Sequence, residues 1–107
     1  MTNFISTGST YWIPDEEIQI LEKNATNGDK NSAFKLYQYH MFVSLDQDSE
    51  FKWLEIAAKN GHPIAQSNLA DLFFTQGNKE KAIFWAKKAY RNSAKLPDEL
   101  KILININ

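Results

Sequence analysis

The sequence predicts an all-α fold, a short α-solenoid of stacked antiparallel helix pairs with about two and a half repeats. Three observations predict it. Turns that contain glycine divide the chain at regular intervals, apolar residues between the turns recur with helical spacing, and similar residues return after 32 positions. Because a helix pair buries its apolar face against neighbouring pairs, such repeats stack into one continuous domain.

Turn signals place the helices in order. We expect five of them, at residues 14–27, 31–43, 49–60, 63–76 and 79–94. Pro14 and the three acids that follow it suit the first turn of a helix, and Asp48 or Ser49 is the expected N-cap of the third helix. The breaks between helices come at Asn27-Gly28, Asn60-Gly61 and Gly77-Asn78. Residues 101–107 fit either a strand or a short apolar cap.

Internal similarity shows how the helices group into repeats. Trp53 and Ala57 return 32 positions later as Trp85 and Ala89, and residues 18–28 match residues 51–61 with a shift of 33. The single domain of residues 1–107 is therefore divided into a half-repeat helix at 14–28, repeats at 31–61 and 63–93, and a C-terminal tail or cap at 94–107. Small residues suit close contacts between helices, and we expect that role for Ala57, Ala58, Ala65, Ala70, Ala82 and Ala89.

Residues 53–70 carry the most specific motif. Trp53 is followed by the pair Ala57-Ala58, by Gly61 and by the pair Ala65-Gln66. This order resembles the Sel-one-like repeat family, whose members are relatives of the tetratricopeptide repeat, and the resemblance covers residues 18–93. Gln38 and Glu50 depart from the small residues usual in that family, and the 32-residue spacing is nearer the tetratricopeptide length. The resemblance implies a helical scaffold that binds other proteins and rarely catalyses.

Composition and charge exclude several classes of protein. The chain has 107 residues, of which 43% are hydrophobic and 23% charged, and no cysteine. It can therefore form neither a disulfide scaffold nor a cysteine-based metal site. No apolar run approaches the length of a membrane span, and residues 1–10 lack the features of an export signal. We expect a cytoplasmic protein that does not contact a membrane.

The charges are divided unevenly along the chain. Residues 1–50 carry a net charge of −5 and residues 51–107 a net charge of +4. The basic residues of the second half cluster at Lys79, Lys81, Lys87, Lys88, Arg91 and Lys95. A solvated helix face explains this cluster and is favoured over nucleic-acid binding.

Groups suited to catalysis are sparse. His40 and His62 are not spaced as a metal-binding pair, and we expect His40 to be half-buried or to face a groove. Residues 46–50 lack the central glycine of a calcium loop, and the four glycines are too isolated to form a phosphate-binding loop. We therefore expect a protein that is not an enzyme, with no catalytic residue, metal or cofactor.

Aromatic residues outside the core pattern supply the candidate binding site. Packing explains the aromatic residues at the repeating positions, which are Tyr37, Trp53, Phe73 and Trp85. Two other sets stand at equivalent positions of the second and fourth helices and would line a concave groove for a protein partner. They are Lys35, Tyr39 and Phe42, and Asp71 and Phe74. The alternative is contact with apolar residues of the termini, Phe4, Ile5, Tyr11, Trp12, Ile102, Leu103, Ile104 and Ile106.

A protein–protein interaction module is the function that we expect from the resemblance. Small single-domain proteins of this kind, rich in asparagine like this chain with its ten, are similar to bacterial immunity proteins. Such a protein binds and neutralises a cognate toxin of an interbacterial competition system, and its protection should fail when Tyr39, Phe42 and Phe74 are replaced together. The alternative is a regulatory adaptor that binds cellular proteins. An exposed end of the stack could also form a homo-oligomer.

Overall fold

The chain is helical through most of residues 10–106, the part that the computed structural model describes. This confirms the predicted all-α class. The elements are α1 (Asp15–Thr26), α2 (Lys30–Tyr39), the π-helix η2 (His40–Ser44), α3 (Gln47–Lys59), α4 (Pro63–Thr75), α5 (Lys79–Arg91) and α6 (Asp98–Leu103). Each of the five predicted helices overlaps one of α1 to α5. Phe4 and Ile5, two of the apolar residues expected as alternative terminal contacts, lie outside the described residues.

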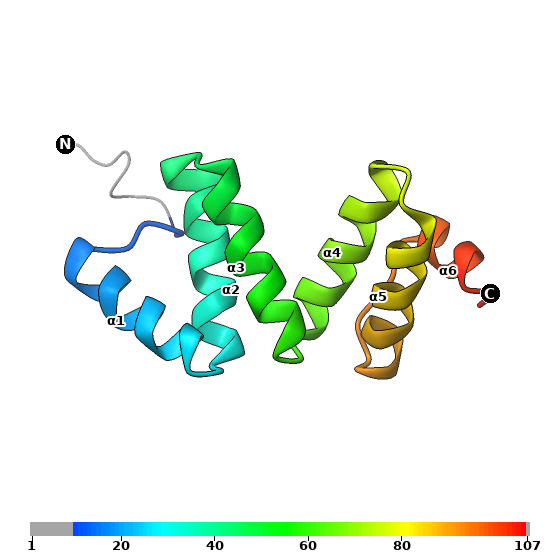
Figure 1. The fold of residues 1–107 in the computed structure, drawn as a ribbon, viewed down its shortest axis with the longest axis horizontal. Coiled ribbons are helices and arrows are strands. Elements are labelled where there is room, and N and C mark those ends of the chain that lie inside the picture. The colour runs from blue at the N-terminus through cyan, green and yellow to red at the C-terminus, as the bar shows by residue number, and fades with distance from the viewer. Residues whose placement is uncertain (1–9, 107) are drawn as a thin grey trace.

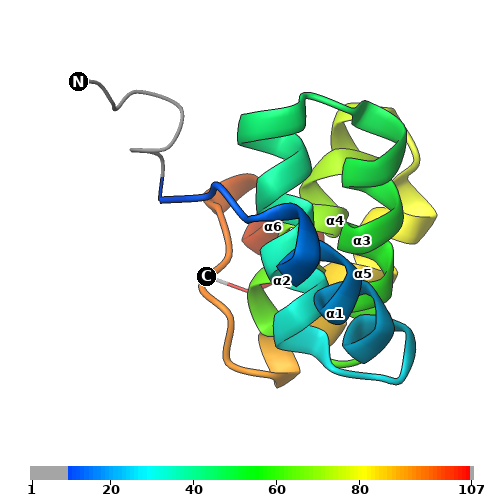
Figure 2. The ribbon, with the colours of Figure 1, turned by 90° about the vertical axis from the view of Figure 1, so that its left-hand side faces the viewer.

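The helices pack mostly against their neighbours in sequence, and the molecule is elongated, with extents of 49, 31 and 23 Å. The most extensive contacts join α2 to α3 and α4 to α5, while α1 and α6 lie at opposite ends (Figure 1). Figure 2 looks from the α1 end and shows the later helices behind it. From their shared turn, α3 and α4 diverge, so that the start of α3 and the end of α4 lie apart (Figure 1).

Side-chain caps explain where the four central helices begin. In each, a side chain accepts a hydrogen bond from a backbone N–H two or three residues ahead, at 3.1 to 3.3 Å. The cap residues are Asp29, Asp46, His62 and Asn78. The expected cap of α3 at Asp48 or Ser49 is therefore wrong. Ser49 is the donor instead, through both its backbone N–H and its hydroxyl, to the carboxylate of Asp46.

The predicted helix ends coincide with left-handed glycines. Gly61 has a φ of 95°, a conformation that glycine adopts without the steric cost of a Cβ atom. Beyond it, the His62 N–H donates to the Ala57 carbonyl at 3.0 Å and so satisfies a carbonyl in the last turn of α3. Gly28 ends α1 in the same way, with a φ of 104°.

Small and aromatic residues build the core as the sequence predicts. All six alanines expected at helix contacts are buried, and so are Tyr37, Trp53, Phe73 and Trp85. Gln66 adds a buried polar link, since only 3% of it is exposed. Its Nε2 donates to the Ala58 carbonyl at the end of α3 at 3.0 Å, and its Oε1 accepts from Asn92 Nδ2 beyond α5 at 2.9 Å. One side chain of α4 therefore joins three helices.

Two segments differ from the expected helices. The predicted helix over residues 31–43 is α-helical only to Tyr39 and continues as the π-helix η2, which ends at Leu45 in a left-handed conformation with a φ of 57°. In the described residues the C-terminal tail is not a strand but forms the short helix α6, which packs against α5. Leu96 ahead of α6, Leu100 within it and Ile104 at its C-cap are buried in the core.

Candidate functional site

A groove lies where α3 and α4 diverge, with α2 and η2 beside it. It consists of two adjacent hollows of about 320 and 440 Å³, which share Glu50, Leu54 and Leu72 in their linings. The other lining residues are Tyr37, Met41, Gln47, Phe51, Asn68, Asp71, Thr75 and Gln76. We name this surface the α3–α4 groove.

The groove has an apolar base. Leu54 is buried in the core, and Met41, Phe51 and Leu72 are partly buried and pack against the same core. The Phe51 ring meets the edge of the buried Phe73 ring with their centroids 6.5 Å apart. These contacts fix the aromatic and aliphatic side chains in place, so that the base of the groove is formed by packed helices and not by loops.

Polar groups surround this base. Tyr37 Oη accepts a hydrogen bond from Asn68 Nδ2 at 3.3 Å, which links α2 to α4. Burial raises the pKa of the Tyr37 hydroxyl, the bond from Asn68 opposes the rise, and the negative charge of Glu50 adds to it. The Tyr37 hydroxyl is therefore neutral at physiological pH and provides hydrogen-bonding capacity beside the Glu50 carboxylate.

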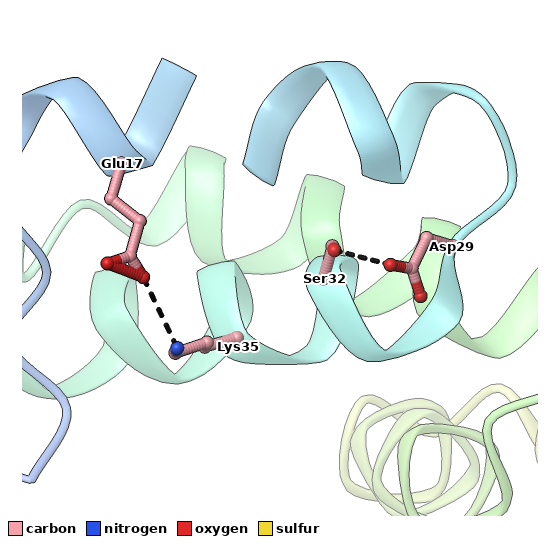
Figure 3. Close-up of polar contacts among 4 residues, drawn as sticks. All are labelled: Glu17, Asp29, Ser32 and Lys35. Carbon is pink, nitrogen blue, oxygen red and sulfur yellow. Dashed lines mark hydrogen bonds and ion pairs between the residues drawn. The ribbon is translucent and has the colours of Figure 1, made fainter. Parts of the chain in front are cut away.

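The structure divides the five residues that the sequence assigned to a partner-binding groove. Asp71 lines the α3–α4 groove. Lys35 instead pairs with Glu17 of α1 across 3.4 Å (Figure 3). Tyr39 is half-buried and its ring meets the edge of the His40 ring with centroids 5.1 Å apart. Figure 3 also shows, at the start of α2, the Ser32 hydroxyl donating to the capping carboxylate of Asp29, at 2.7 Å.

The other two residues also lie outside the groove lining. Phe42 is 52% exposed and stacks on Tyr11 with ring centroids 4.5 Å apart. This is a contact with the N-terminal segment, the alternative that the sequence left open. Phe74 is half-buried and packs against the core. Whether these residues bind a partner stays a prediction.

The π-helix explains why Phe42 leaves the face expected for Lys35, Tyr39 and Phe42, since only Phe42 of the three lies in η2. Their spacing of four and three residues places them on one face only while the chain stays α-helical. Hydrogen bonds in a π-helix span five residues instead of four, so the residues of η2 are rotated away from the positions that an unbroken α2 would give them. Met41 thereby lines the groove, while Phe42 meets Tyr11.

Sequence reasoning missed most of the groove residues for identifiable reasons. The repeating position of Tyr37 predicts packing, which its burial confirms, although Tyr37 also lines the groove. Glu50 lines the groove and departs from the small residue expected at its position. That departure was the available signal, because a carboxylate at a helix-contact position requires space or solvent beside it.

The two histidines have different surroundings. His40 is half-buried, as expected, and its Nδ1 shares a hydrogen bond with Ser44 Oγ at 2.7 Å, whereas its Nε2 is buried and has no hydrogen-bond partner in the described chain. Burial lowers the pKa of His40. His62 stacks on Phe34 with centroids 4.0 Å apart, and its Nδ1 accepts from Ala65 N–H at 3.2 Å. Burial lowers the pKa of His62 as well, and only the form with an unprotonated Nδ1 can cap α4.

A second, polar hollow of about 590 Å³ lies beside the turn between α3 and α4, where α5 also ends. Its charged lining residues are Lys59, Lys88 and Arg91. All three occupy the last turns of their helices, where positive charge compensates the negative end of the helix dipole. The Lys88 ammonium also lies over the Phe84 ring at 5.2 Å. The helix ends thus account for the position of these charges.

Residues 10–106 contain no group of three or more histidine, aspartate or glutamate side chains placed to hold a metal ion. Among the helices in this range, none has both the length and the apolar character needed to cross a membrane.

Comparison with known proteins identifies a relative but not a family. The chain is similar to the uncharacterized protein YibG of Escherichia coli (strain K12), with 32% identity over 94 residues. The match covers 81% of this chain and 61% of YibG, so the chain spans less than two thirds of the length of its relative. No protein-family model matches the chain, and no solved structure does. The chain is thus a small all-helical protein with distant homology to YibG.

Proposed function

We propose that this protein is a non-enzymatic interaction module that binds a protein partner in the α3–α4 groove. The observation that carries the proposal is the groove itself, two adjacent hollows that share an apolar base and have polar groups around it. Protein interfaces combine a packed apolar centre with a polar rim in the same way. Because the lining comes from α2, η2, α3 and α4, the binding surface is held by regular structure.

The helices form, in this proposal, a short solenoid of about two and a half repeats related to the Sel-one-like repeat. Support comes from the matching environments of equivalent residues, since Trp53 and Trp85 are both buried and so are Ala57 and Ala89. Helices that contact mainly their neighbours in sequence suit the same architecture. A stack of this kind exposes one side of several consecutive helices, which is where the groove lies.

The specific partner that we propose is a toxin of an interbacterial competition system, which the protein neutralises as its immunity protein. The resemblance to repeat-based immunity proteins motivates this assignment. Neutralisation requires only that the toxin be occluded or held in an inactive form, and a groove of packed side chains can do this by binding alone.

Affinity co-purification of the tagged protein from its source cells, at moderately high salt, tests the proposal. The expected result is one stoichiometric partner that is toxic when expressed alone and harmless when this protein is expressed with it. Several substoichiometric cellular partners would favour a regulatory adaptor instead. No partner at all would contradict the proposed function.

A steric substitution then locates the binding surface. Thr75 is an exposed groove residue at the end of α4, and its hydroxyl donates to the Asp71 carbonyl at 2.9 Å. Thr75→Trp should occupy the groove and abolish protection. Thr26 provides a matched control, because it is exposed at the end of α1 and donates in the same way to the Glu22 carbonyl at 2.7 Å. Thr26→Trp should leave protection intact.

A further inference from the structure

Two carboxylates give the α3–α4 groove a negative charge. Glu50 of α3 is half-buried, and Asp71 of α4 is exposed. No lysine, arginine or histidine lines either of the hollows that form the groove. Within residues 10–106, the ion pairs are Lys35 with Glu17, Lys59 with Glu55 and Lys101 with Asp98, so neither groove carboxylate has a basic partner in this part of the chain.

The carboxylates flank an apolar surface. Leu54 and Leu72 line the same hollows as Glu50, and Met41 and Asp71 lie in the hollow nearer α2. Glu50 lines the same hollow as Tyr37, and its negative charge adds to the rise in the pKa of the Tyr37 hydroxyl that burial causes. A half-buried carboxylate has lost part of its hydration. Its electrostatic attraction for an approaching cation is therefore stronger than that of a fully exposed carboxylate.

We propose that the occupant of the groove is a basic segment of the partner, in which an apolar side chain lies between lysine or arginine residues. This proposal rests on the proposed function and specifies the partner's chemistry. The apolar side chain contacts Leu54, Leu72 and Met41, while the flanking cations pair with Glu50 and Asp71. Acidic peptides and nucleic acids carry the same sign of charge as the groove and are repelled from it.

Three short synthetic peptides test this chemistry directly on the isolated protein. The first has a central leucine with two arginines on each side, the second replaces the arginines by glutamates, and the third replaces the leucine by alanine. Each is titrated into the ¹⁵N-labelled protein and followed by amide chemical shifts. We expect the arginine–leucine peptide to produce saturable shifts around Glu50, Leu54, Asp71 and Leu72. The acidic peptide should produce none, and the alanine peptide should bind more weakly.

Neutral variants distinguish the effect of these two groove carboxylates on binding from the effect of the negative charge elsewhere on the protein. Glu50→Gln with Asp71→Asn should weaken binding of the arginine–leucine peptide about fivefold to tenfold, the loss expected for two partly exposed ion pairs. The control is Asp15→Asn with Glu16→Gln, which removes the same charge from exposed positions of α1. It should change the affinity by less than about twofold, because the effect of distant exposed charges is screened by salt.

Equal binding of the basic and acidic peptides, shifts outside the groove, no saturable shifts, or equal effects of the two variant pairs would overturn this inference. None of these results bears on whether a stoichiometric partner co-purifies or whether Thr75→Trp blocks it. Failure of the charge assignment is therefore distinguishable from failure of the proposed function.

Discussion

Replacing Gln66 by leucine removes the side chain that joins α3, α4 and α5 while keeping a similar volume in the core. Two hydrogen bonds are lost, to the Ala58 carbonyl and from Asn92 Nδ2. Neutral hydrogen bonds contribute about 0.5–1.5 kcal/mol each in net terms, so their loss costs about 1–3 kcal/mol.

The groups that Gln66 leaves behind reduce this cost. The Ala58 carbonyl still accepts the Gly61 N–H at 3.1 Å, and Asn92 is exposed, so water can replace its lost partner. The buried leucine side chain also contributes a favourable hydrophobic free energy that the polar end of glutamine does not provide. We therefore expect Gln66→Leu to lower the free energy of unfolding by about 1–2 kcal/mol, toward the lower end of the range for two hydrogen bonds.

Urea titration followed by circular dichroism measures this change. An equal slope of the unfolding free energy against urea concentration confirms that the original protein and the variant expose the same surface on unfolding. The Gln66→Leu and Asn92→Ala variants and their combination form a double-mutant cycle. The coupling energy should be about 0.5–1.5 kcal/mol, the net contribution of one neutral hydrogen bond. Strictly additive effects, or a Gln66→Leu variant as stable as the original protein, would refute the assignment of Gln66 as the link between the three helices.

Three further predictions concern packing, pH and charge. Leu69→Ala should lower the free energy of unfolding by about 2–5 kcal/mol because Leu69 is fully buried, whereas Ile64→Ala, at an exposed position, should change it by less than about 0.5 kcal/mol in the same urea titration. The free energy of unfolding should fall as the pH drops through about 6.5, since burial lowers the pKa of His62 in the folded state and the unfolded chain then binds more protons. Titrations at several pH values should show a smaller fall for His62→Asn, which keeps a capping acceptor but does not titrate; an undiminished fall would exclude His62 as a source. A double-mutant cycle on Lys35 and Glu17 should give less than about 1 kcal/mol, because these side chains are 55% and 43% exposed, and a larger coupling would contradict this.

Local signals in the sequence were sufficient to predict the main helices. Pro63 marks the start of α4, and Gly61 marks the end of α3 by adopting a φ of 95°. Each of these signals depends on one or two residues and their immediate neighbours, so the sequence alone can contain it. The recurrence of Trp53 at Trp85 likewise predicted two buried positions.

The C-terminal helix was predictable but was missed. The seven-residue window of 101–107 favoured neither helix nor strand, because it leaves out the first turn of α6, which begins at Asp98. Extending the window back to Pro97 would have given a start signal, because this proline is followed by the acids Asp98 and Glu99 in the first turn of α6.

The candidate site was less accessible to sequence reasoning because it depends on relations between helices. The π-helix changes which residues of the second helix share a face, and no proline or glycine in residues 30–44 marks it. Tyr37 shows the second difficulty, because a repeating core position can also line a groove. The divergence of α3 from α4, which opens the groove beside Glu50 and Leu72, is a tertiary feature that spacing along the chain does not encode.

The affinity of the co-purified partner for the groove variants tests the central claim most directly. Calorimetric titration of that partner into the original protein, Thr75→Trp and Thr26→Trp compares two equivalent substitutions that differ in whether they occupy the α3–α4 groove. If the partner binds in the groove, Thr75→Trp should weaken binding at least about tenfold, and Thr26→Trp should leave it within about twofold. Unchanged affinity for a folded Thr75→Trp variant would contradict the claim that the partner binds in the α3–α4 groove.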